Sequence, residues 1–87
     1  MVAIRRDFTA DQARAVALEL GVDPDEAGFD IEQFRRGMQV ELEHGRRDPA
    51  TDVTHDDPIV TGKIALAHIR ELPDYYDRLE AMERQAQ

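Results

Sequence analysis

Two segments decide the fold, Val40-Glu41-Leu42-Glu43-His44-Gly45 and Lys63-Ile64-Ala65-Leu66-Ala67-His68-Ile69-Arg70-Glu71-Leu72. Glu41 and His44 are three positions apart in the first segment, and His68 and Glu71 are three positions apart in the second. Side chains at this spacing lie on the same face of an α-helix. We therefore expect two helices that pack side by side, each turning a carboxylate and an imidazole toward the other.

Helix start signals outward from these segments predict an all-α bundle of about four short helices. Thr9 and Gln12 have the form of a capping box, which predicts a first helix over residues 10–20. The pair Asp30 and Gln33 is a second capping candidate, opening a helix over residues 31–44. Gly45 is expected to end that helix, because glycine readily adopts the left-handed conformation found after helices.

Prolines mark the remaining helix starts. Pro24 allows one short helical turn between the first two helices, since proline is tolerated at a first helical position. Asp57 and Pro58 predict the cap and first residue of a third helix over residues 58–72. Pro73 restarts the chain into a fourth helix, whose end we expect to fray from residue 83.

The third helix is apolar nearly all round, so we expect it to be the most buried and His68 to be buried with it. Gly37 in the middle of the second helix indicates a close neighbour there, because glycine costs about 1 kcal/mol against alanine in a helix. Tyr75 and Tyr76 fall on the apolar stripe of the fourth helix and are expected to be core aromatic residues.

Length and composition exclude several classes of function. The 87 residues form one domain, spanning positions 1–87, and the absence of cysteine excludes disulfides, thiolate metal sites and thiol catalysis. A net charge of −8 opposes binding to nucleic acid backbones and leaves a protein partner with a basic surface as an option. We expect no membrane span and a cytoplasmic location, and a homo-oligomer stays open.

The connection over residues 46–57 is long for a helix–helix link in a small domain. It is rich in side chains that bond to the backbone, among them Asp52, Thr54 and the capping Asp57. We expect this loop either to be ordered by its own hydrogen bonds or to serve a function.

The facing Glu and His residues allow three readings. In the first, they form a buried hydrogen-bond network that fixes how the helices meet. In the second, they bind one Zn, Mn or Fe ion, with His44 and His68 as nitrogen ligands and Glu41 and Glu71 as oxygen ligands. Asp74 or Tyr75 would then hydrogen-bond to these ligands and orient them. The third is acid–base catalysis. We favour the network and assign no catalytic residue.

An ordered series of motifs between residues 30 and 83 supports a family assignment. The series runs through Glu-Leu-Glu-His-Gly at 41–45, Asp-Val-Thr-His-Asp-Asp-Pro at 52–58, Gly-Lys-Ile-Ala-Leu-Ala-His at 62–68 and Pro-Asp-Tyr-Tyr at 73–76. It resembles a family of short bacterial and phage-associated proteins known only as a domain of unknown function. The resemblance implies a common core built from Glu41, Glu43, His44, His68, Glu71, Asp74, Tyr75 and Tyr76. Asp52 departs from the family pattern, which tends to asparagine there.

The sequence therefore predicts a small acidic helical protein with an interaction or accessory role, in which the Glu and His cluster organises the core. The alternative is a small metalloprotein that binds one divalent ion through Glu41, His44, His68 and Glu71, with hydrolytic or redox activity.

Overall fold

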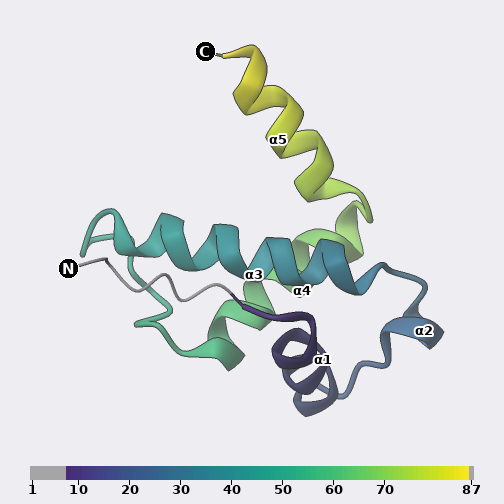
Figure 1. Ribbon diagram of the computed structural model, residues 1–87. Helices are drawn as coiled ribbons and strands as arrows, with labels where there is room; N and C mark the ends of the chain where they lie inside the picture. The colour runs from purple at the N-terminus through teal and green to yellow at the C-terminus, as the bar shows by residue number, and fades with distance from the viewer. Residues whose placement is uncertain (1–7, 87) are drawn as a thin grey trace.

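The computed structural model describes residues 8–86 and contains five α-helices and no strand within that range (Figure 1). The helices are α1 (Ala10–Glu19), α2 (Pro24–Ala27), α3 (Ile31–Arg46), α4 (Pro58–Glu71) and α5 (Tyr75–Gln85). The predicted all-α bundle is confirmed, with the expected single turn after Asp23 appearing as α2. None of the helices in the described range has the length and apolar character needed to cross a bilayer.

Local capping signals place the helix starts where the sequence predicted them. The Thr9 hydroxyl accepts a hydrogen bond from the Gln12 amide, and the Gln12 side chain accepts one from the Thr9 amide, which completes the capping box of α1. The Asp57 carboxylate accepts from the amides of Ile59 and Val60 at the start of α4. These bonds satisfy backbone donors that have no partner inside a helix.

The predicted end of α3 at Gly45 is wrong, because the helix continues to Arg46. Gly45 is buried inside the last turn, where an added Cβ would lie 3.3 Å from Asp52 Oδ1. The glycine therefore makes room for the following loop to fold back onto α3. A side chain at that position would hold the loop further out.

The core lies where α1, α3 and α4 meet. Helix α3 packs most extensively against α4, and α1 packs on both. Helix α4, which we expected to be the most buried, shares the central position with α3, since each packs against α1, against α5 and against the other. A close contact locks α1 to α4: an added Cβ on Gly62 would lie 2.4 Å from Val16 Cγ1. The buried apolar residues of this core are Ala13, Val16, Ala17, Val22, Phe34, Met38, Leu42, Ala65, Leu66, Ile69 and Tyr76.

The loop between α3 and α4 is held by its own side chains. Asp52 Oδ1 accepts from the His55 amide, and the buried Thr54 hydroxyl accepts from the Asp56 amide. His55 and Asp56 both have positive φ angles, of 47° and 65°. Arg46 Nε donates to Asp56 Oδ1 at 2.8 Å, which ties the loop to the end of α3. Of the two expectations for this loop, the hydrogen bonds support the ordered one.

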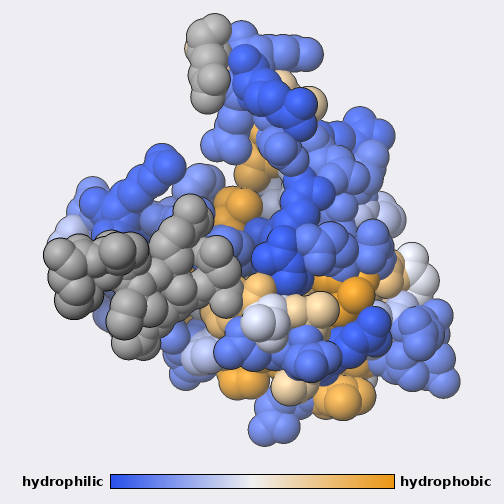
Figure 2. Space-filling model, viewed as in Figure 1, coloured by the Kyte–Doolittle hydropathy of each residue, from blue (hydrophilic) through white to orange (hydrophobic). Residues whose placement is uncertain are grey.

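Helix α5 leaves the bundle at an angle and projects away from it (Figure 1). Its contacts are with α3 and α4, and Tyr76 is its one buried residue. The helix extends to Gln85, past residue 83, from which we expected its end to fray. Hydrophobic surface lies between α3 and the projecting part of α5 (Figure 2).

Candidate functional site

A cluster of three polar side chains joins α3, α4 and α5. The Tyr76 hydroxyl of α5 donates to Glu41 Oε2 of α3 at 2.8 Å. His68 Nδ1 of α4 lies 3.1 Å from the Tyr76 oxygen and 3.3 Å from Glu41 Oε2. Each residue comes from a different helix, so the cluster fixes how the three helices meet.

The bonding pattern assigns the protons of the cluster. The single hydroxyl proton of Tyr76 goes to Glu41, so His68 Nδ1 can bond the Tyr76 oxygen only as a donor. Burial, together with the hydrogen bond to Glu41, raises the pKa of the Tyr76 hydroxyl above its ordinary value. Tyr76 therefore remains a neutral donor under physiological conditions.

Aromatic rings cover the cluster on one side. The Tyr75 ring stacks on the His68 ring with centroids 4.4 Å apart and planes within 3°. The Tyr76 ring meets Tyr75 edge to face, with centroids 4.9 Å apart. Stacked and edge-to-face pairs of this kind are favourable beyond their buried area. The Tyr75 ring thus helps to hold the imidazole against Glu41.

Two residues of α3 place Tyr76 in the cluster. An added Cβ on Gly37 would lie 2.3 Å from Tyr76 Cε2, so only glycine lets the ring rest against the helix backbone. The Gln33 side-chain oxygen accepts from the amides of Tyr76 and Asp77, at 2.8 and 3.1 Å. Asp74, the residue before α5, makes no capping bond with its side chain, so Gln33 takes over that role from another helix.

The structure brings together two of the four residues of the predicted metal site. Glu41 and His68 are in contact, with side chains 13% and 33% exposed, whereas His44 and Glu71 are exposed. No group of three or more His, Asp or Glu residues between positions 8 and 86 is placed to hold a metal ion. The third member of the cluster is instead the Tyr76 hydroxyl, from a helix that the spacing argument left out, and it is the close partner of both Glu41 and His68.

The structure also shows where His68, the pair Asp74 and Tyr75, and the loop residues lie. His68 is partly exposed rather than buried. Tyr75 contacts His68 by ring stacking, while Asp74 bonds to Arg78 Nε at 2.8 Å on the surface. In the loop, Asp52 and Thr54 bond within the loop and Asp57 caps α4, so all three hold backbone amides.

Sequence reasoning missed the role of Gln33. We interpreted it as part of a capping box with Asp30, but Asp30 caps α3 through the Glu32 amide and the Gln33 side chain points to α5. The available signal was that Gln33 lies four positions before Gly37 and so on the same helix face, where Gly37 already indicated a close neighbour. For Gly37 the expected close neighbour is confirmed, and it is Tyr76.

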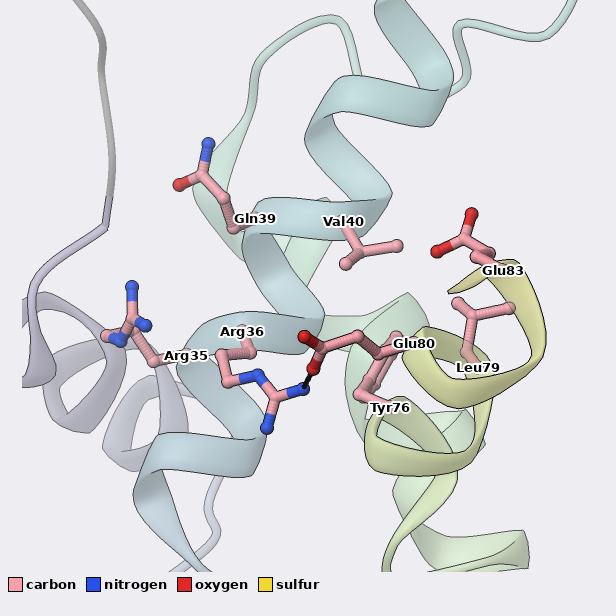
Figure 3. A pocket seen from close by; sticks show the side chains of 8 residues that line it. All are labelled: Arg35, Arg36, Gln39, Val40, Tyr76, Leu79, Glu80 and Glu83. Atoms are coloured by element: carbon pink, nitrogen blue, oxygen red, sulfur yellow. Dashed lines mark hydrogen bonds and ion pairs between the residues drawn. The ribbon is translucent and has the colours of Figure 1, made fainter. Parts of the chain in front are cut away.

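A groove of about 220 Å³ lies beside the cluster, between α3 and α5. Val40 of α3 and Leu79 of α5 face each other across it, and Arg36 bridges its inner end by donating to Glu80 (Figure 3). The Tyr76 ring contributes to its floor, and Glu83 lies at its outer edge. Its apolar lining comes from Val40, Tyr76 and Leu79, and its other lining residues are Arg35, Arg36, Gln39, Glu80 and Glu83.

Comparison with known proteins identifies the family. A family model described as "Protein of unknown function (DUF5661)" matches residues 13–85. No curated protein and no solved structure matches the chain. Because the family model covers most of the 87 residues, the chain belongs to this family.

Proposed function

We propose that this member of the DUF5661 family is a small acidic interaction protein in which the Glu41–Tyr76–His68 cluster organises the core and α5 acts as a docking element. One observation carries the proposal. The base of α5 is anchored by Tyr76, which is 2% exposed, whereas every residue of α5 from Glu80 onward is exposed.

The hydrogen bonding of the cluster supports a structural role for it. Glu41, Tyr76 and His68 satisfy one another, and every buried side-chain nitrogen or oxygen between residues 8 and 86 has a hydrogen-bond partner. A site built to bind a substrate usually keeps polar groups directed into a cavity. Here the polar groups of the cluster are directed at each other.

The exposure of the outer half of α5 supports a docking role. Its residue Met82 is 60% exposed and Leu79 is only partly buried, which leaves an apolar stripe without a covering layer in the described range. Helices of this length are marginal in water without packing. A helix that is anchored at one end and exposes Met82 on its free part is therefore suited to bind another helix or a groove.

In-cell cross-linking in the native host tests the proposal. We compare a tagged chain with Met82→Glu on α5 and with Leu18→Glu on α1, a matched control because Leu18 is also well exposed, at 69%. Cross-linked species, whether with itself or with another protein, should be lost with Met82→Glu and kept with Leu18→Glu. An unchanged set of cross-links with Met82→Glu, in a variant whose circular dichroism matches that of the wild type, contradicts the proposal.

A further inference from the structure

The apolar stripe on the free part of α5 has the spacing of a coiled-coil seam. Leu79, Met82 and Ala86 are separated by three and then four residues, which is the alternation of a and d positions in a heptad. With Leu79 as a, Met82 takes d and Ala86 the next a. One turn earlier, Tyr75 falls on d, and there the seam is already covered by the His68 ring of α4. The seam is therefore covered at the base of α5 and open beyond it.

The groove between α3 and α5 adjoins the open seam at Leu79. Leu79 lines this groove opposite Val40 of α3, whereas the seam residues Met82 and Ala86 do not line it (Figure 3). A helix paired along the seam would therefore border the groove rather than fill it.

The charges that flank the seam show what kind of helix fits. In this register Arg78 occupies a g position and Glu83 the following e position, five residues later. In a parallel two-stranded pair, a g residue of one helix meets the next e residue of its partner. A second α5 lying parallel to the first would therefore bring Arg78 of each copy to Glu83 of the other, twice by symmetry.

Both charged groups are accessible for this pairing. Arg78 donates to Asp74, the residue before α5, but both side chains are well exposed, and the remaining donors of Arg78 face solvent. Glu83 makes no ion pair with any other residue between positions 8 and 86. An antiparallel pair would instead place g against g and e against e, so that Glu83 would meet Glu83 or Tyr76 and no opposite charges would meet.

We propose that a second copy of this chain docks through α5, in a parallel, two-fold symmetric pair in which the open seams of the two α5 helices meet. The inference rests on the proposed docking role of α5 and names its occupant. A different protein on the same face would be compatible with the docking role but not with this inference.

Sedimentation equilibrium of the purified full chain tests the dimer. We expect a reversible monomer–dimer equilibrium that Met82→Glu shifts to monomer and that Leu18→Glu leaves unchanged. Arg78→Glu and Glu83→Arg should each raise the dimer dissociation constant by about threefold to tenfold, since each creates two like-charge contacts. The double variant, Arg78→Glu with Glu83→Arg, should return it to within about twofold of the wild type. A monomer at all concentrations up to about 1 mM overturns the proposal.

A single cysteine tests the parallel orientation, because the chain has no cysteine of its own. Ala86→Cys places identical residues next to the two-fold axis in the parallel pair, within the Cα separation of about 4–7 Å that a disulfide requires. In an antiparallel pair the same two residues lie at opposite ends. We expect Ala86→Cys to oxidise to a covalent dimer faster than Leu18→Cys, with the wild-type circular dichroism retained. Equal rates for the two variants overturn the parallel pair.

Discussion

The two halves of α5 are treated differently by the rest of the molecule. The first turn places Tyr76 against the backbone of α3 at Gly37, bonds its hydroxyl to Glu41 and receives its cap from Gln33. The second half, from Glu80 onward, is exposed and supported by surface ion pairs such as Arg84 to Glu80. Such exposed pairs contribute little to stability. The comparison indicates that the stability of the chain depends on the base of α5, and that the free half is available for a partner.

Truncation of Tyr76 should produce the largest effect, because it removes the anchor itself. We expect Tyr76→Ala to lower the free energy of unfolding by about 3–5 kcal/mol, the range for deletion of a fully buried aromatic ring. Tyr76→Phe keeps the ring and should cost about 1–2 kcal/mol, since it removes the hydroxyl that Glu41 accepts from. Urea unfolding followed by circular dichroism measures both. A loss below about 1 kcal/mol for Tyr76→Ala would show that α5 is not anchored in the core.

A methyl group at Gly37 of α3 should weaken the packing of the Tyr76 ring against that helix. Gly37→Ala would place Cβ 2.3 Å from Tyr76 Cε2, so the buried ring has to move. We expect a net loss of about 1–3 kcal/mol, even though alanine favours the helix by about 1 kcal/mol.

Gly45→Ala is the matched control for Gly37→Ala, since its Cβ would meet the side chain of Asp52 at 3.3 Å and a loop can shift by a few tenths of an ångström. Its free energy of unfolding should change less in the same urea titration. Equal losses at the two glycines would argue against a special contact between α3 and α5.

The ion pair between Arg36 and Asp77 should give a smaller, pH-dependent effect at the base of α5. The Arg36 guanidinium, with help from Gln33, lowers the pKa of Asp77 below its ordinary value. A carboxyl group with a lowered folded-state pKa adds stability above its unfolded-state pKa, and this contribution disappears as the pH falls through the folded-state pKa. Arg36→Ala should therefore raise the pKa of Asp77, and the stability difference between wild type and variant should vanish in acid.

Carboxyl carbon chemical shifts, followed by NMR across an acid titration, measure the pKa of Asp77 in both proteins. A value that is the same in the wild type and in Arg36→Ala would show that the pair seen between Arg36 and Asp77 is not formed in solution.

Met82 should give the smallest effect on the free energy of unfolding. At protein concentrations low enough to keep the chain monomeric, we expect Met82→Ala to change it by no more than about 0.5 kcal/mol, because the side chain is 60% exposed. Thermal unfolding of dilute samples measures the change. A loss above about 1 kcal/mol would remove the contrast between the two halves of α5.

Helix starts could be predicted from the sequence because the signals are local. The side chains of Thr9 and Asp57 bond to amides two or three residues away, so the pattern and the structure describe the same contact. The end of α3 could not be predicted in this way. Gly45 makes room for the loop residue Asp52, which packs against it. From the sequence alone, a glycine that permits such a close approach cannot be distinguished from one that ends a helix.

The candidate site was predictable only in part, for a similar reason. Spacing within each helix identified Glu41 and His68 correctly as residues that face each other. It could not show that Tyr76, from a third helix, comes between the carboxylate and the imidazole, or that His44 and Glu71 are turned to solvent. The position of Tyr76 depends on how α5 meets α3, and Gly37 and Gln33 of α3 set that contact rather than any pattern within α5.

The cap that Gln33 provides has a consequence for the order of folding. The residue that stabilises the first turn of α5 lies 43 positions earlier in the chain than Tyr76, on a helix that is itself completed before α5 is synthesised. Forming a contact over so long a separation carries a large loop-closure cost, so it follows the local contacts in time. Helix α5 should therefore gain its cap only after α3 has formed, and a nascent chain acquires an anchored α5 later than the helix that anchors it.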